Sequence, residues 1–470
     1  MKSITNKNLG NFSRAYFIIF LTLLAGIYSY IYFPHAFIIN EDITLINASD
    51  VDSGSIMTSI LSLFDYPYYS MFNSYHSNYY GWTYYVVTFL FLIPVKTVNY
   101  LFFNSDPTID YLTIRLVFFL IGLFYVFATF TLFNKISLNK ERFFSFLLSL
   151  LLLLPFATNL FIQIHPETTG LLFLTLGILF LINFSRNYLN KNFNYSIFFL
   201  ALASCAKQIF FIGSIPLLIC FYTLLAKKKN LTFYKYLTNS ESKKYFYRSA
   251  KIGILVFFAI NPYVILHPIN FIMRQGELIL NFQSGSISFY ENINAWLNLI
   301  KGQAVLCISL IIVPINIFSS FILYWKKDKT VNFYLNMANC FAILFILIMT
   351  IRGNNYLHSA HYLNPLSLFL YLNILSVGLF LINFSNKITA IIIRIFIYSF
   401  LVYYLIFQYS NVKVYLEERL DFKSTLPYIT YEYIKNLTKD DPSLRIAHDH
   451  FIAPPSDLKF TCHYWNTCSG

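Results

Sequence analysis

Four carboxylates lie close together directly after the first long apolar run of the chain. Glu41 and Asp42 are adjacent, and Asp50 and Asp52 follow within the same twelve residues. A carboxylate that reaches a reacting hydroxyl acts as a general base, and carboxylate oxygens also bind divalent metals. The same residues also suit a solvated loop in which Asp50 or Asp52 caps a helix. As a catalytic base we rank Asp52 first and Asp50 second, with Glu41 and Asp42 in reserve.

Three cations stand at the ends of later apolar runs. These are Arg115, Lys207 and Arg352. An arginine binds phosphate through two parallel hydrogen bonds, and a lysine binds it as a point charge. Alternatively, each side chain extends to the lipid headgroups. In either role we expect replacement of these cations to disturb folding little.

Other polar side chains occur in short steps between apolar runs. One step is His165-Pro166-Glu167, and another contains His358, His361 and Tyr362. Two histidines three residues apart resemble a metal pair, but no third ligand is evident in the sequence. We therefore assign no metal ligands and leave a divalent metal open as a cofactor.

Aromatic residues are concentrated before the second apolar stretch, where Tyr80 and Trp82 flank Gly81. Tyrosine and tryptophan are favoured where a membrane meets water, because their rings are apolar and their tips are polar. The same ring faces and hydroxyl groups also suit the binding of a sugar. Both interpretations stay open for Tyr80 and Trp82.

Apolar runs of about 20 residues, long enough to cross a bilayer core of about 30 Å, recur along the chain. The composition agrees, because 57% of the 470 residues are hydrophobic and 20% are aromatic. Backbone polar groups in lipid must be satisfied within the segment, so these runs are expected to be helices. We predict an all-α polytopic membrane protein with about eleven transmembrane helices, at residues 15–33, 111–133, 142–161, 168–185, 193–206, 208–225, 250–266, 299–325, 331–350, 363–384 and 388–409.

Basic residues predict the orientation of these helices. The net charge of +13 comes largely from lysines in short loops, above all residues 227–251. Such loops are typical of the cytoplasmic side, so the charge does not indicate nucleic-acid binding. With the N-terminus inside, a long first loop (34–110) with juxtamembrane helices lies outside. The stretch 83–103 then has to be a re-entrant or interfacial helix. Residues 1–409 form the membrane module, and 410–470 form a small outer tail.

Taken in order, these features resemble the GT-C superfamily, integral membrane glycosyltransferases that use polyprenyl-phosphate sugars. Members include the protein O-mannosyltransferases and the aminoarabinose transferases of lipid A. The resemblance covers about residues 15–385 and lies in the order of loose motifs. The acidic first loop departs from it, because Glu41-Asp42 reverses the usual Asp-Glu pair. The later motifs are Ile114-Arg115-Leu116, Leu154-Pro155, His165-Pro166-Glu167, Ala206-Lys207, Asn261-Pro262-Tyr263 and His361-Tyr362-Leu363-Asn364-Pro365.

The resemblance implies a glycosyltransferase at the outer face of a membrane, expected to be a bacterial inner membrane. It would move a sugar from a polyprenyl-phosphate donor to a lipid, glycan or protein acceptor, among membrane lipids and without nucleic acid. The first-loop carboxylates would supply the base, and the cations, histidines, Glu167 and aromatic residues would bind substrate. The alternatives are a polytopic transporter or lipid flippase, and a polysaccharide polymerase of another membrane family.

Overall fold

The computed structural model describes most of the helical part of the chain. The described residues are 2–36, 56–57, 59–61, 64, 82–103, 105–137, 141–154, 158–162, 164–261, 264–265, 268–269, 271–273, 294, 304–325, 339–340, 343, 364–420, 426–441, 446–448 and 461–463.

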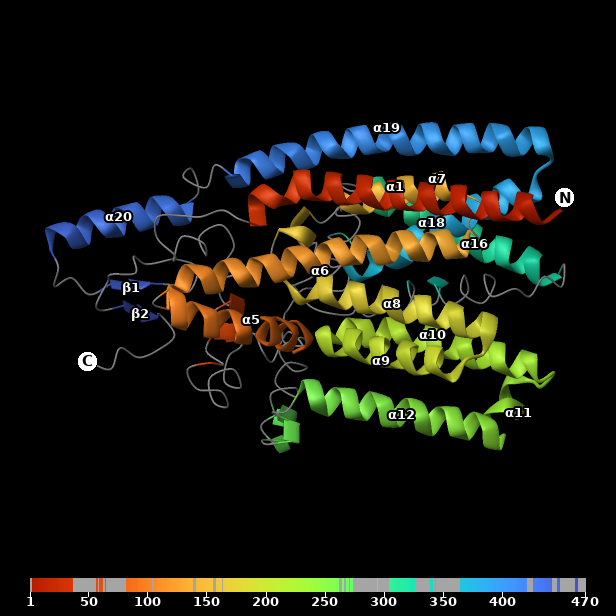
Figure 1. Cartoon of the computed structure of the whole chain (residues 1–470), viewed down its shortest axis with the longest axis horizontal. Coiled ribbons are helices and arrows are strands. Elements are labelled where there is room, and N and C mark those ends of the chain that lie inside the picture. Colours follow the sequence, from red (N-terminus) through yellow and green to blue (C-terminus); the bar gives the residue numbers. More distant parts are fainter. Residues whose placement is uncertain are drawn as a thin grey trace.

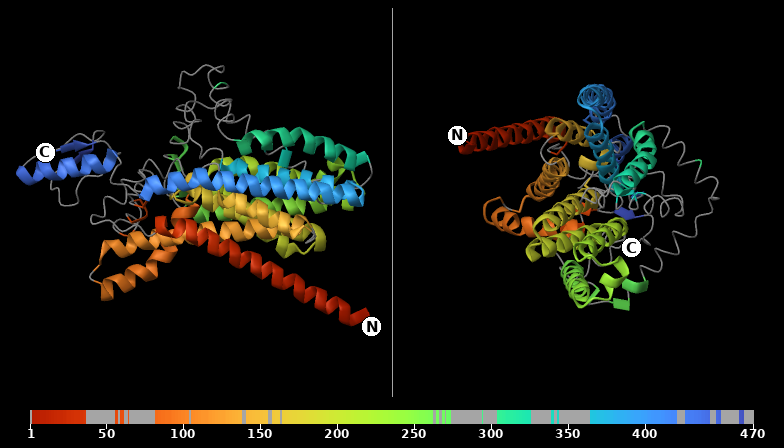
Figure 2. Two further views of the ribbon diagram at one scale, coloured as in Figure 1. Left: turned by 90° about the horizontal axis from the view of Figure 1, so that it is seen from above. Right: turned by 90° about the vertical axis from the view of Figure 1, so that its right-hand side faces the viewer.

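Long helices run side by side along the longest axis of the molecule (Figure 1), and an end-on view shows them gathered into a bundle (Figure 2). A short 3-10 helix, η2 (Thr158–Phe161), interrupts the series. The α-helices are α1 (Lys2–Ala36), α5 (Thr83–Phe102), α6 (Pro107–Ile136), α7 (Arg142–Leu153), α8 (Pro166–Asn187), α9 (Asn190–Ala206), α10 (Gln208–Lys228), α11 (Phe233–Leu237), α12 (Ser240–Ile260), α16 (Ala304–Trp325), α18 (Asn364–Phe384), α19 (Lys387–Leu420) and α20 (Leu426–Asp440).

The helical bundle confirms a multi-pass membrane architecture at the coarse level. Within the described residues, five helices are long and apolar enough to cross a membrane: Ala15–His35, Thr83–Phe102, Thr108–Ile136, Pro166–Asn187 and Lys387–Val414. Four of them coincide with predicted spans. The predicted total of about eleven stays a prediction, because one span, 331–350, lies almost wholly outside the described residues.

The predicted span 142–161 is not one continuous helix. Helix α7 ends at Leu153 after 12 residues, and η2 begins only at Thr158. Twelve helical residues rise about 18 Å, which is short of a bilayer core. Pro155 gives the reason, because a proline pushes the residue before it out of the helical conformation. Leu154 accordingly has φ −111° and ψ 65°.

Two short strands depart from the expected all-α tail. β1 (Ile446–His448) and β2 (Thr461–His463) pair in parallel, with Ala447 opposite Cys462. Figure 1 shows them with α20 at one end of the molecule, while the N-terminus and α11 lie at the other. The basic segment 227–251 and the tail are therefore at opposite ends of the bundle, as the predicted orientation requires.

Helices α8 and α9 form a closely packed antiparallel pair. A Cβ added to Gly177 would come within 2.7 Å of the Leu200 side chain, so the glycine permits this close approach. The Ser196 hydroxyl also donates to the Gly177 carbonyl oxygen at 2.8 Å. Small residues let helices approach closely where lipid offers no competing hydrophobic drive. This packing brings the beginning of α8 to the end of α9.

Candidate functional site at one end of the bundle

Glu167 forms the centre of a buried polar cluster in the first turn of α8. Helix α8 begins at Pro166, whose fixed φ and missing N–H suit a first helical position. The Glu167 side chain is fully buried. Its Oε2 lies 2.5 Å from His165 Nδ1, and its Oε1 forms an ion pair with Lys207 Nζ. Both carboxylate oxygens therefore have partners within the protein.

Lys207 occupies the single extended residue that separates α9 from α10. Its φ of −159° and ψ of 140° interrupt what would otherwise be a continuous helix. The residue is only 7% exposed. A lysine that extended to the headgroups would keep its ammonium in water, so this burial excludes the headgroup interpretation for Lys207. Its removal would leave the buried charge of Glu167 without its lysine partner, with only His165 in contact, so we no longer expect folding to be little disturbed.

Arg115 is also buried and contacts the end of the first helix. One terminal nitrogen of its guanidinium donates to the main-chain carbonyl oxygen of His35 at 3.2 Å. His35 lies in the last turn of α1, where carbonyl groups lack helical partners and favour a positive charge. Arg115 therefore fixes the point at which the first loop leaves α1, which sequence reasoning had not assigned to it.

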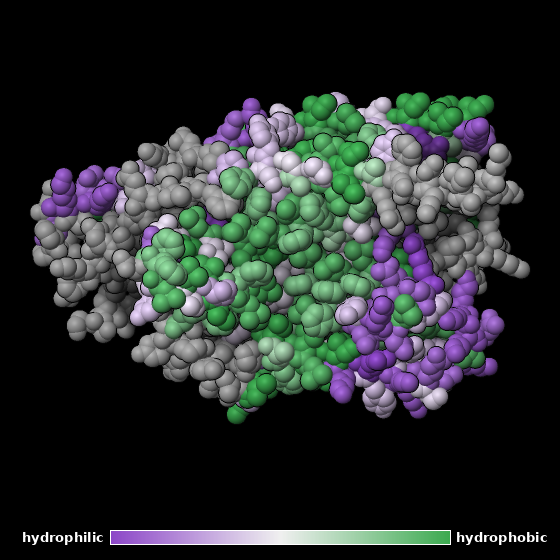
Figure 3. Space-filling view, in the orientation of Figure 1, coloured by the Kyte–Doolittle hydropathy of each residue, from purple (hydrophilic) through white to green (hydrophobic). Residues whose placement is uncertain are grey.

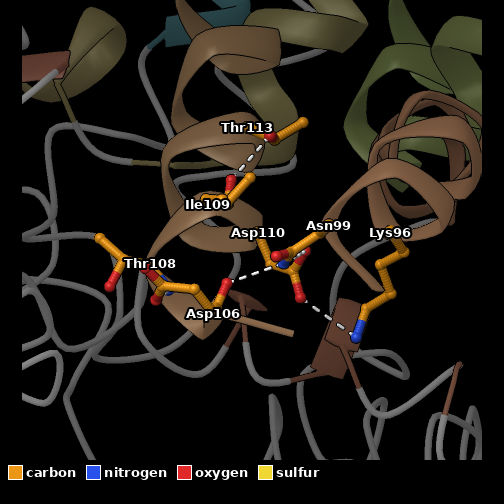
Figure 4. Close-up of polar contacts among 7 residues, drawn as sticks. All are labelled: Lys96, Asn99, Asp106, Thr108, Ile109, Asp110 and Thr113. Atoms are coloured by element: carbon orange, nitrogen blue, oxygen red, sulfur yellow. Dashed lines mark hydrogen bonds and ion pairs between the residues drawn. The ribbon is translucent and has the colours of Figure 1, made fainter. Parts of the chain in front are cut away.

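A second polar cluster joins α5 to α6 (Figure 4). Lys96 Nζ lies 3.1 Å from Asp110 Oδ2, and the Asn99 amide donates to Asp110 Oδ1 at 3.2 Å. Asp106 caps α6 by accepting from the Thr108 amide at 2.9 Å. Sequence reasoning missed this cluster as a unit. The sequence feature that could have revealed the cluster is Asp-Pro-Thr-Ile-Asp at residues 106–110, which is typical of a helix start with acidic residues in the first turn.

Helix α5 begins where α9 ends, rather than at the far side of the bundle. The Thr83 hydroxyl donates to the Leu202 carbonyl oxygen at 2.9 Å, and Leu202 precedes Lys207 by five residues. Tyr84 donates to the Ile114 carbonyl oxygen, near the start of α6, at 3.4 Å. From this start, α5 runs away from the site toward the end of the molecule that carries α20 (Figure 1). This geometry supports an interfacial hairpin over a crossing, although α5 is apolar enough to span.

Trp82 immediately precedes α5 and is packed into the main hydrophobic core at 6% exposure. A ring packed in this way suits the role of a core residue better than that of an exposed sugar-stacking platform. The segment after Asp52 also reaches the core, because Ile56, Met57 and Ile60 are helical and fully buried. Phe64 contacts Phe89 of α5, with ring centroids 4.8 Å apart.

The remaining predicted site residues lie outside the described residues. They are Glu41, Asp42, Asp50, Asp52, Tyr80, Arg352, His358, His361 and Tyr362. The structure therefore brings together His165, Glu167 and Lys207, and it places Arg115 near the start of α6 and the end of α1. Within the described part of the chain, no group of three or more His, Cys, Asp or Glu side chains could hold a metal ion.

The fold and composition define the class of this protein as a helical multi-pass membrane protein. No protein-family model matches the chain, and no curated protein matches it.

Proposed function

We propose that the protein is a membrane glycosyltransferase that moves a sugar from a polyprenyl-phosphate donor to a lipid, glycan or protein acceptor. The observation that carries the proposal is the buried Glu167–Lys207 ion pair with His165. It lies at the end of the bundle opposite the basic segment 227–251. A donor whose reactive phosphate lies at a membrane face needs cations held at that face, with water partly excluded.

The proposed chemistry is a displacement at the anomeric carbon of the sugar. A first-loop carboxylate, Asp52 before Asp50, takes the proton of an acceptor hydroxyl. The acceptor oxygen then forms a bond to the anomeric carbon, and the bond from that carbon to the phosphate oxygen breaks. Polyprenyl phosphate leaves with the bonding electron pair and its negative charge. Glu41 and Asp42 are the reserve candidates for the base.

The cations stabilise the departing phosphate in this scheme. Arg115, Lys207 and Arg352 supply positive charge that counts most when the bond to phosphate breaks. Glu167 is better described as a positioning residue than as a substrate ligand, since both its oxygens are occupied by Lys207 and His165. Holding the lysine in place beforehand avoids reorganisation during the reaction.

The test is an assay of bond cleavage with purified full-length protein in liposomes. Polyprenyl-phosphate mannose and polyprenyl-phosphate aminoarabinose, each labelled in the sugar, are supplied with a membrane extract as acceptor. Transfer of label, or slow release of free sugar without acceptor, is expected. Movement of intact donor across the bilayer without cleavage would instead establish the flippase alternative. The matched control is the Asp50→Asn/Asp52→Asn variant.

A further inference from the structure

The connection between α10 and α12 presents a dense array of exposed cations. Residues 227–251 contain eight lysines and arginines against a single carboxylate, Glu241. That carboxylate is already engaged, because its Oε2 lies 3.0 Å from Lys229 Nζ. Seven of the eight cations are exposed: Lys227, Lys228, Lys229, Lys235, Lys243, Lys244 and Lys251.

Large aromatic side chains are exposed among these cations. Tyr234 on α11 is 77% exposed, and Phe246 and Tyr247 on α12 are 60% and 69% exposed. Rings of this kind are favoured at the boundary between acyl chains and headgroups. We call this set of seven lysines and three aromatic residues the basic–aromatic surface.

Contacts between α12 and α9 hold the basic–aromatic surface in place. Tyr245, between Lys244 and Phe246, turns inward, and its ring centroid lies 4.9 Å from that of Phe193. Its hydroxyl donates to Asn190 Oδ1 at 3.1 Å. Burial and the nearby Glu241 carboxylate raise the pKa of Tyr245, so the phenol remains a neutral donor. The outward side chains of α12 are therefore presented in a defined orientation.

The basic–aromatic surface continues directly into apolar surface. Beyond Lys251, helix α12 exposes Ile254, Leu255 and Phe258, which are 55%, 59% and 40% exposed. Figure 3 shows the hydrophilic region around α11 and α12 bordering the hydrophobic middle of the molecule. Seven residues of helix, from Lys251 to Phe258, rise about 10 Å. The cations thus stand at headgroup level when the apolar surface contacts acyl chains.

We propose that the basic–aromatic surface binds the headgroups of anionic phospholipids in the adjoining leaflet. The lysines pair with headgroup phosphates, and Tyr234, Phe246 and Tyr247 insert at the boundary below them. Each lysine near an anionic surface contributes about 1 kcal/mol, or roughly fivefold in affinity. Nucleic acid or an acidic protein would match the charge but not the apolar surface that adjoins it, so lipid is favoured. Lipid binding at this surface does not require the proposed glycosyltransferase activity.

The test compares two triple variants of the full chain in neutral detergent. Lys235→Gln/Lys243→Gln/Lys244→Gln removes three charges from the basic–aromatic surface. Lys413→Gln/Lys435→Gln/Lys439→Gln removes three exposed charges at the opposite end. Binding of a fluorescent phosphatidylglycerol is measured, with phosphatidylcholine as the neutral comparison. The first variant is expected to bind phosphatidylglycerol at least tenfold more weakly, given roughly fivefold per lysine. The second variant is expected to bind it as the wild type does.

Salt, the exposed aromatic side chains and a competing ligand provide three further tests of lipid binding. Wild-type binding should weaken as NaCl rises from about 0.05 to about 0.5 M, because salt screens exposed charge. Phe246→Ser/Tyr247→Ser should weaken binding by a factor that salt does not change. Equal loss in both triple variants, salt-independent wild-type binding, or equal affinity for phosphatidylcholine would overturn the inference. Displacement of the lipid by a single-stranded oligonucleotide at stoichiometric concentration would overturn it in favour of nucleic acid.

Discussion

Glu167 and Lys207, forty residues apart in the sequence, form a buried ion pair that joins the start of α8 to the link between α9 and α10. A buried pair adds little net stability, because both ions lose their hydration. Breaking it by removing one partner is costly, since the other charge remains buried. The main role of the pair is therefore to hold the start of α8 and the link between α9 and α10 in a defined arrangement.

Removing one member of this pair should destabilise the protein more than removing both. We expect Glu167→Gln or Lys207→Met alone to cost roughly 3–5 kcal/mol, because each leaves a buried charge without its partner. The double variant Glu167→Gln/Lys207→Met should recover much of that loss. Thermal unfolding in detergent, followed by tryptophan fluorescence, measures the coupling between the two sites.

The exposed pair Lys229–Glu241 is the matched control. Its N–O distance is 3.0 Å, but the two side chains are 48% and 39% exposed. Lys229→Met and Glu241→Gln should each change stability by less than about 1 kcal/mol. Additive losses at Glu167 and Lys207, with no recovery in the double variant, would show that the two side chains do not act as a pair.

The base can be identified by amide substitution, which preserves shape and removes basicity. We expect Asp52→Asn to lower the rate of sugar transfer by about 10²–10⁴, with Asp50→Asn the second choice. Thermal stability should stay near that of the wild type. Glu41→Gln and Asp42→Asn serve as comparisons in the same loop. Near-normal transfer by both the Asp50 and Asp52 variants would exclude them as the base.

The sidedness of the bundle can be read by cysteine labelling in intact cells. Lys244→Cys reports on the basic segment, and Asn436→Cys on α20, in a background in which Cys462 and Cys468 are replaced by serine. Both positions are exposed, and Cys205, Cys220 and Cys340 are buried. We expect only Asn436→Cys to react with a membrane-impermeant maleimide. Labelling of both from outside would contradict the predicted orientation.

Helix α5 offers a separate test of the span count. If it is interfacial, the turn between α5 and α6 lies on the same side as the tail. Phe103 is 54% exposed and directly follows α5 in this turn, so Phe103→Cys reports the side on which the turn lies. We expect it to label from outside, as Asn436→Cys does. If α5 instead crosses the membrane, Phe103→Cys will be protected until the cells are opened.

The sequence predicts the apolar helices well, because a long hydrophobic run in lipid can satisfy its own backbone polar groups only as a helix. The predicted span 250–266 covers only the apolar part of α12, which begins earlier, at Ser240. Asn239 caps a helix whose first turns are amphipathic and basic rather than apolar. The sequence selects His165, Glu167 and Lys207 separately but does not predict their pairing. That pairing depends on the close approach of α8 and α9 at Gly177, a tertiary contact with no local signature.

A further ion pair joins two helices at the end of the bundle that carries the basic segment. Arg394 of α19 contacts Glu141 Oε1 through two nitrogens, at 3.1 and 2.7 Å, and Tyr398 donates to Oε2 at 2.8 Å. Glu141 directly precedes α7 and is largely buried, with a side chain that is 11% exposed. These three bonds link the start of α7 to α19 across 253 residues of sequence for Arg394 and 257 for Tyr398.

Loss of this link should loosen α19 from the bundle. Hydrogen bonds to charged groups contribute about 1.5–3 kcal/mol, and partial exposure of Arg394 reduces that, so we expect Arg394→Gln to cost about 1–2 kcal/mol. The control is Lys413→Gln, also on α19, whose partner Glu417 lies at 3.5 Å with both side chains more than half exposed. It should cost a few tenths of a kcal/mol, roughly 0.3–0.5. Unfolding titrations in sodium dodecyl sulfate compare the two variants. Equal losses would mean that the Arg394–Glu141 contact does not hold α19 in place.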